Sequence, residues 1–136
     1  MEQKTIAVIH RDKGLASTLA EMAQQLGYSS LVMIVDSASA PQQVSSFVDR
    51  VSPDLVLLAE NYQRWIPVQG TKIEDFKLGE GIDALVEIRK NHPTLPVYMV
   101  SGNPKHMEEA MQRGANGYLP IRIGFKGYEE FLKSNL

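Results

Sequence analysis

The polar side chains that could do chemistry in this sequence come directly after short apolar runs. Five places follow these runs in order: His10-Arg11-Asp12, Asp36-Ser37, Ala59-Glu60-Asn61, Ser101-Gly102-Asn103 and Pro120-Ile121-Arg122. The carboxylate of Asp12 could hold a cation, and the guanidinium groups of Arg11 and Arg122 could bind an anion. None of the five places combines a base, a nucleophile and an oxyanion donor, so the residues predict no enzyme.

The apolar runs themselves predict the strands that position these side chains. The runs are Thr5–Ile9, Leu31–Val35, Leu55–Ala59, Val97–Val100 and a weaker one around Tyr118–Leu119. They are continuous rather than alternating, which is typical of strands buried on both faces of a parallel sheet. Between them, apolar residues recur at helical spacing, and Met33, Met99, Met107 and Met111 are expected to pack in the core.

Strands that alternate with helices predict an α/β fold. We expect a five-stranded parallel sheet in a doubly wound, flavodoxin-like, three-layer sandwich. In such a sheet functional groups lie at the carboxyl ends of the strands, where the five polar places fall. Gly27 and Gly114 follow helical patterns, at the position where glycine commonly ends a helix.

Composition excludes several classes of protein. The chain has 136 residues, a net charge of −2 from 14 basic and 16 acidic residues, and no cysteine. The length predicts a single domain over residues 1–136, and the missing thiols exclude disulfides and cysteine-built metal sites. The balanced charge predicts no nucleic-acid partner. No signal peptide or membrane span is apparent, so we expect a cytoplasmic protein without a cofactor.

One segment interrupts the rhythm between Glu60 and Glu80. It runs for about twenty residues, well above the ~2–6 residues usual between a strand and a helix, and we treat 61–78 as an insertion. Its aromatic residues Tyr62 and Trp65 are candidate partner contacts. The alternative is that they fold back over the sheet.

Four stretches in order resemble the receiver domain of bacterial response regulators, the CheY-like family. Pro53–Leu58 is similar to the lead into the phospho-acceptor strand, and Gly81–Arg89 is similar to the third helix. Pro96–Gly102 is similar to the strand ending in the switch hydroxyl, and Gly114–Pro120 is similar to the approach to the last strand. The resemblance covers nearly the whole chain apart from the insertion. It implies aspartyl-phosphate chemistry, in which Mg²⁺ and a lysine neutralise the phosphoryl group.

Most groups that this chemistry needs are replaced here. Ala59 stands at the position of the phospho-acceptor aspartate, and Ile121 stands at the position of the lysine. His10 and Arg11 stand where the family has its acidic pair, which leaves Asp12 beside a fixed positive charge. Asp12 could be a residual metal ligand, pair with an arginine, or cap the following helix. The resemblance therefore implies a degenerate receiver, a pseudo-receiver that has lost the chemistry.

Two residues match the family pattern, namely Ser101 and Tyr118 at the positions of the switch pair. They could still form a switch, or they could have only structural roles. We expect a stand-alone signalling module of a two-component or phosphorelay pathway that binds a protein partner independently of phosphorylation. Alternatives are phosphorylation at a replacement residue such as Glu60 or Asp12, and a small anion-binding domain that uses Arg11, Ser101 and Arg122.

The resemblance also implies where a partner would bind. In the family, the fourth helix, the fifth strand and the fifth helix form the partner or homodimer face. The residues of this chain expected there are Lys105, Glu109, Arg113, Lys126 and Glu130.

Overall fold

Strands and helices alternate along the chain. The structure is a computed structural model that describes residues 3–36, 40–60, 80–101 and 107–136. The strands are β1 (Thr5–His10), β2 (Ser29–Ile34), β3 (Leu55–Ala59), β4 (Val97–Ser101) and β5 (Gly117–Pro120). The helices are α1 (Lys13–Gln25), α2 (Pro41–Val51), α3 (Glu80–Asn91), α4 (Met107–Gln112) and α5 (Phe125–Asn135).

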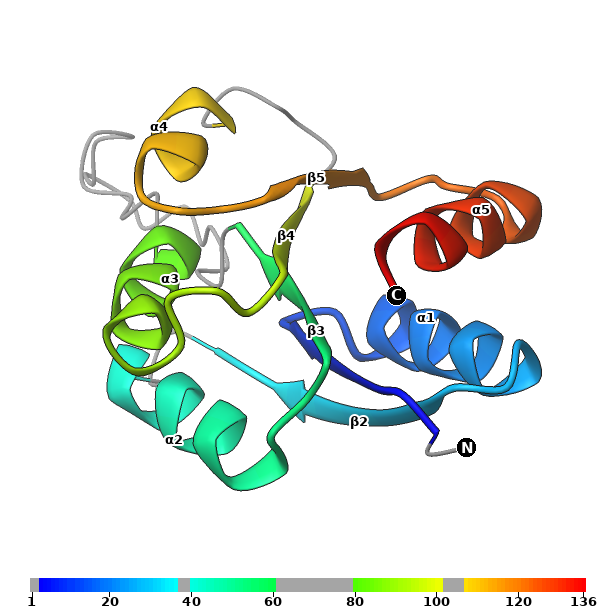
Figure 1. Ribbon diagram of the computed structural model, residues 1–136, viewed down its shortest axis with the longest axis horizontal. Helices are drawn as coiled ribbons and strands as arrows, with labels where there is room; N and C mark the ends of the chain where they lie inside the picture. The colour runs from blue at the N-terminus through cyan, green and yellow to red at the C-terminus, as the bar shows by residue number, and fades with distance from the viewer. Residues whose placement is uncertain (1–2, 37–39, 61–79, 102–106) are drawn as a thin grey trace, which may run out of the picture.

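The strands form one parallel sheet, as the sequence predicts. Its order is β2-β1-β3-β4-β5, and every neighbouring pair is parallel. Figure 1 shows β2 and β5 at opposite edges of the sheet. Because all five strands run in one direction, their carboxyl ends lie at the same end of the sheet, called here the carboxyl edge. This arrangement brings the polar places of the sequence together.

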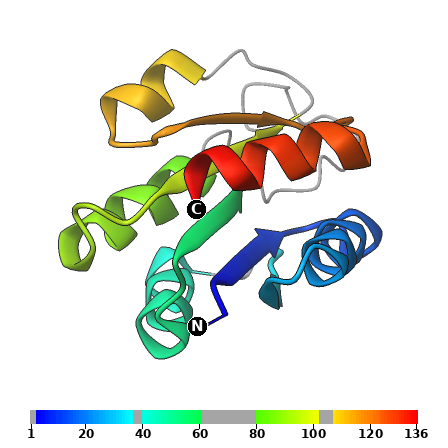
Figure 2. The ribbon, with the colours of Figure 1, turned by 45° about the vertical axis from the view of Figure 1, so that its right-hand side comes forward.

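Helices cover both faces of the sheet. In Figure 1, α2 and α3 lie on one side and α1 and α5 on the other, and Figure 2 shows α5 in front of the sheet. Each face buries its own apolar cluster. The first joins strand residues such as Ile9 and Leu58 to α2 and α3, and the second joins Val8 and Leu57 to α1 and α5. The predicted α/β sandwich is confirmed.

The expectation that every strand is buried on both faces is wrong for the two edge strands. In β5 only Leu119 is buried, and β2 is the clearer case. Leu31, Val32 and Ile34 are 47%, 37% and 45% exposed, whereas all residues of β3 are buried. The reason is topological: β2 lies at the edge of the sheet, where helices cover less of it. A continuous apolar run does not distinguish an edge strand from a central one.

The expectation that four methionines pack in the core is also wrong in part. Met99 is buried and Met33 packs against the first cluster, but Met107 and Met111 are 40% and 45% exposed. These two residues are four positions apart on the short helix α4, so they share one face. That face is turned away from the sheet, while Ala110 faces inward.

Two glycines end helices as expected, and an arginine holds one of these ends. Gly27 and Gly114 have positive φ angles of 96° and 110°. The guanidinium of Arg89, in α3, donates hydrogen bonds to the carbonyls of Gly114, His92 and Leu95 and to Oδ1 of Asn116, over 2.6–2.9 Å. Arg89 thus ties the end of α3 to the turn before β5.

Candidate functional site

The candidate residues lie at the carboxyl edge of the sheet, where the strands end. The register pairs Ile9 with Leu58 and Ala59 with Val100, so the ends of β1, β3 and β4 are neighbours. On the far side, Ser101 pairs with Pro120 of β5. The structure therefore gathers the positions that the receiver resemblance assigns to the phosphorylation site.

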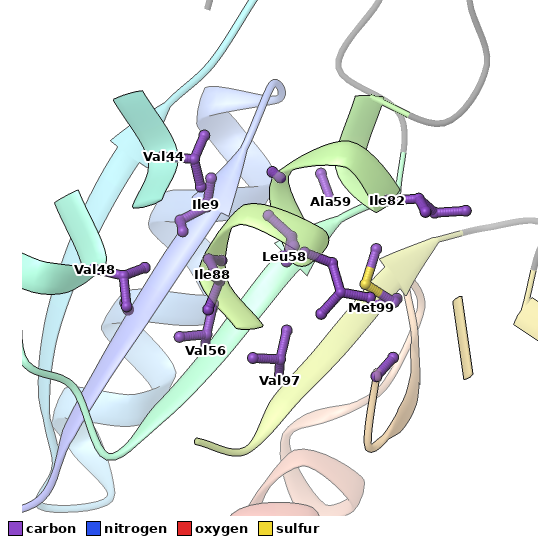
Figure 3. Packing of buried hydrophobic residues seen from close by; sticks show 14 of the residues in the cluster. Ile9, Val44, Val48, Val56, Leu58, Ala59, Ile82, Ile88, Val97 and Met99 are labelled. Carbon is purple, nitrogen blue, oxygen red and sulfur yellow. The ribbon is translucent and has the colours of Figure 1, made fainter. Parts of the chain in front are cut away.

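Ala59 is a core residue at the carboxyl edge. It is 1% exposed and belongs to the apolar cluster beneath α2 and α3. Figure 3 shows it among apolar side chains, close to Ile82 at the start of α3. A buried methyl group offers neither a nucleophile nor a ligand, so nothing at this position can carry a phosphoryl group.

His10 is buried and neutral at the end of β1. It is 5% exposed, and its Nδ1 accepts a hydrogen bond from the backbone N–H of Asp12 at 2.9 Å. In the neutral ring the hydrogen therefore lies on Nε2. Burial lowers the pKa of His10, the charge of Arg11 lowers it further, and Asp12 opposes both. His10 is thus held in its uncharged form.

Asp12 caps α1. Its Oδ1 accepts a hydrogen bond from the backbone N–H of Leu15 at 3.1 Å, and its backbone is extended. This satisfies one of the free N–H groups at the start of the helix. The capping alternative is therefore confirmed, and the carboxylate already has a structural task. Arg11 precedes it and is exposed.

The residues at the carboxyl edge do not fit the magnesium ion that the receiver resemblance implies. Mg²⁺ requires carboxylate oxygens in near-octahedral geometry. His10 and Ala59 supply no carboxylate, Arg11 brings a positive charge, and Asp12 is engaged at the helix. Within the described ranges, no group of three or more His, Cys, Asp or Glu side chains could hold a metal ion.

The positions of the switch pair and of the lysine contact one another. The hydroxyl of Tyr118 donates to the carbonyl of Ser101, and the backbone N–H of Ile121 donates to the same carbonyl at 3.3 Å. The side chain of Ile121 packs against the cluster beneath α1 and α5. An apolar side chain thus occupies the lysine position, while Tyr118 is fixed to the end of β4.

Glu60 and Gly81 lie where the chain leaves and re-enters the described fold. The backbone N–H of Gly81 donates to the carbonyl of Glu60 at 3.1 Å. A Cβ on Gly81 would lie 2.0 Å from the carbonyl oxygen of Ala59, so only glycine fits. Glu60 is 5% exposed, and its Oε1 is buried without a hydrogen-bond partner in the described structure.

The candidate partner residues divide into two groups. Glu109 on α4, Arg113 just after it, and Lys126 and Glu130 on α5 are all exposed. Tyr62, Trp65 and Lys105 lie outside the described residues, as does the predicted insertion at 61–78. The exposed residues on α4 and α5 therefore remain predictions of a partner surface, now placed on helices that flank β5.

Sequence reasoning missed the role of Arg89 and the burial of the Glu60 side chain. Three of the four acceptors of Arg89 are backbone carbonyls, which leave no mark in a sequence. Alternation along a strand puts the side chains of Ala59 and Glu60 on opposite faces, but it does not show that both are buried. Gly81 gave a usable signal, because a glycine at the start of a helix has a poor helix propensity and needs a packing reason.

Comparisons with known proteins find the same fold among solved structures. No protein-family model matches the chain, and no curated protein matches it. Among solved structures, the receiver domain of NtrX from Brucella abortus has a TM-score of 0.73 and 22% identity, over 96% of this chain and 97% of that one. The receiver domain of sensor histidine kinase PA1611 from Pseudomonas aeruginosa, solved with a magnesium ion in its active-site cleft, has a TM-score of 0.73 and 20% identity, over 98% of each chain.

A longer NtrX structure matches as well. It has a TM-score of 0.75 and 23% identity over 99% of this chain, but the match spans only 27% of NtrX. The fold of the described residues is therefore that of a receiver domain. No helix in them has the length and apolar character needed to cross a membrane.

Proposed function

We propose that this chain is a pseudo-receiver, a cytoplasmic signalling module of a two-component type of pathway that binds a protein partner without being phosphorylated, and that it is not an enzyme. One observation carries the proposal: the residue at the phospho-acceptor position, Ala59, is a buried methyl group in the apolar core. The receiver fold of the described residues supports the signalling assignment.

The neighbouring groups support the same conclusion. Phosphoryl transfer depends on positioned positive charge around the phosphoryl oxygens and on a metal held by acids. Here His10 is neutral and buried, the carboxylate of Asp12 caps α1, and the partly buried Ile121 packs against the apolar cluster beneath α1 and α5. Each of these three side chains has a structural role, so this part of the carboxyl edge is packed as part of the fold.

A partner surface is supported on the side of the sheet that ends in β5. Met107 and Met111 on α4 and Phe125 at the start of α5 are exposed large apolar residues. Exposed methionine and aromatic side chains are enriched in binding surfaces. With the exposed charges of Glu109 and Lys126 nearby in sequence, they support a protein partner rather than a small ligand.

Incubation with acetyl phosphate and Mg²⁺, or with beryllofluoride, tests the absence of phosphorylation. We expect no added mass and no change in amide NMR shifts, while a conventional receiver domain treated in parallel responds. The triple variant Arg11→Asp, Ala59→Asp, Ile121→Lys should regain partial Mg²⁺ binding, because the fold is kept. A stoichiometric adduct on Glu60 or Asp12 of the wild type would instead establish phosphorylation at a replacement residue.

Capture from the source cell tests the partner surface. The chain serves as bait beside the variant Met111→Lys, with Gln112→Lys as the matched control, since both positions are exposed on α4. We expect one protein to be captured by the wild type and by Gln112→Lys and lost with Met111→Lys. Equal capture by all three would remove the α4 face from the proposal.

A further inference from the structure

Within the described ranges, the backbone groups on the outer edge of β2 have no strand partner. In the described part of the chain, β2 has one strand neighbour, β1. The N–H groups of Ser29 and Val35 donate to β1 and its flank, at the carbonyls of Lys4 and His10. Because backbone groups alternate in direction along a strand, those of Ser30, Val32 and Ile34 point away from β1.

The side chains along this edge are apolar and exposed. Leu31, Val32 and Ile34 are 47%, 37% and 45% exposed. Between Ser29 and Ile34 there is no charged residue and no proline. Edge strands that stay unpaired usually carry a charge, a proline or a bulge that prevents another strand from docking. This edge lacks the first two and also has the exposed apolar surface of a binding site.

We propose that two copies of this chain associate through their β2 strands, which pair antiparallel about a two-fold axis beside Val32. The backbone groups of Val32 then bond to those of Val32 in the second copy, and those of Ser30 bond to those of Ile34 in the second copy. Every outward N–H and C=O of the edge thereby gains a partner. Only an extended strand satisfies groups that lie in the plane of the sheet, which fixes the kind of occupant.

The side chains and charges favour a second copy as that strand. In this register Leu31 of one copy lies beside Met33 of the other, on the face covered by α2. Met33 already lines an open hollow of about 490 Å³ with Gln42, Gln43, Ser46 and Arg50, which leaves room for the incoming leucine. The two strands carry no charge, so their pairing brings no like charges into opposition.

The proposed dimer is independent of the proposed function. β2 and β5 lie at opposite edges of the sheet (Figure 1). A dimer formed through β2 therefore leaves α4, β5 and α5 open to a signalling partner, and it would display two such surfaces.

Sedimentation velocity of the full chain from micromolar to millimolar concentration tests the proposal. The wild type and the conservative Val32→Thr variant are expected to dimerise. Val32→Lys and Val32→Glu each place like charges opposite one another and should each weaken dimerisation by roughly tenfold or more. An equimolar mixture of these two variants should dimerise again, because the opposed charges become complementary. A wild type that stays monomeric overturns the proposal, and so does a dimer that neither charge weakens or that the mixture fails to restore.

Amide hydrogen exchange on the unsubstituted chain gives a second test that does not depend on the variants folding. The N–H groups of Ser30, Val32 and Ile34 should exchange slowly at high concentration and at least tenfold faster on dilution. Those of Leu31 and Met33, which the alternation directs at β1, should be protected at both concentrations and act as the internal control. Exchange at the three outward positions that does not depend on concentration overturns the proposal.

Discussion

His10 is a buried imidazole whose protonation the fold resists. Its Nδ1 must stay unprotonated to accept the N–H of Asp12, and burial lowers its pKa below the ordinary value of 6.5. The unfolded chain therefore binds more protons on this residue than the folded chain does as the pH falls below about 6.5. The contribution of His10 to stability is complete above that pH and is lost as the pH falls towards the lowered pKa.

We predict that His10→Asn reduces this pH dependence. Asparagine can still accept the N–H two residues on, but it does not titrate. Urea unfolding at about pH 7.5 and about pH 5.5 gives the free energy of unfolding of both proteins. The loss between the two pH values should be smaller for the variant. Equal losses in both proteins would show that His10 is not the group responsible.

Tyr128 has a buried hydroxyl that finds no hydrogen-bond partner among the residues that the structure describes. The side chain is 0% exposed in the cluster beneath α1 and α5, no described group bonds its hydroxyl, and burial raises its pKa. An unsatisfied buried polar atom costs about 1–3 kcal/mol. We predict that Tyr128→Phe raises the free energy of unfolding by about 1 kcal/mol, seen as a higher Tm.

A second tyrosine of the same cluster provides the control for that substitution. The hydroxyl of Tyr98 donates to Oδ1 of Asn135 at the end of α5. Tyr98→Phe leaves that acceptor unpaired and should lower the Tm. If both variants shift in the same direction, the hydroxyl of Tyr128 has a partner in solution.

At the scale of elements, Gly81 determines how closely α3 approaches β3. A Cβ there would lie 2.0 Å from the carbonyl oxygen of Ala59 and 2.6 Å from that of Glu60, and backbone atoms cannot move aside as a flexible side chain can. We predict that Gly81→Ala destabilises the fold by about 3 kcal/mol. Chemical denaturation measures the free energy of unfolding, and the loss should come from the packing of α3 against β3.

The matched control for this substitution is Gly14→Ala in α1. A Cβ on Gly14 meets only Oδ1 of Asp12, at 3.4 Å, which is an ordinary contact. Alanine is also the better helix former, so the control should be as stable as the wild type or slightly more so. A loss at Gly14 equal to that at Gly81 would contradict the packing argument.

The elements differ in how far the sequence could predict them. The strands β1 and β3 are covered on both faces, so their continuous apolar runs correctly predict that they are buried. The run in β2 is equally apolar, yet Leu31 and Ile34 are exposed, because burial depends on the strand order, which no local pattern encodes. The exposed face of Met107 and Met111 on α4 was missed because apolar residues at helical spacing do not show whether another element covers them.

At the scale of the whole molecule, the alternation of strands and helices was enough to predict the parallel sheet and the carboxyl edge where the polar residues gather. The contacts within the site could not be predicted from that alternation. The position of Ala59 followed from the sequence, but its burial beneath α3 follows from Gly81. The neutral state of His10 follows from its burial and from the hydrogen bond that its Nδ1 accepts from the backbone N–H of Asp12. These contacts join segments through backbone atoms, which side-chain patterns do not record.

We predict that the fold survives removal of the insertion. Glu60 and Gly81 are joined by a hydrogen bond, so the ends of the intervening segment already lie together. Replacing residues 61–79 with a Gly/Ser link of about four residues should leave a single cooperative thermal transition. A Gly/Ser segment of the original length is the control that separates sequence content from length. Loss of cooperativity in both would show that the segment stabilises the core.

The adjacency of Glu60 and Gly81 also makes this point of the chain tolerant of change in length. Closing a loop of twice the length costs only about 0.6 kcal/mol more. A lineage could therefore gain or lose residues here without disturbing the sheet. The same tolerance makes it a place to graft a fluorescent reporter, whose signal would follow events at the carboxyl edge while β2 and β5 stay untouched.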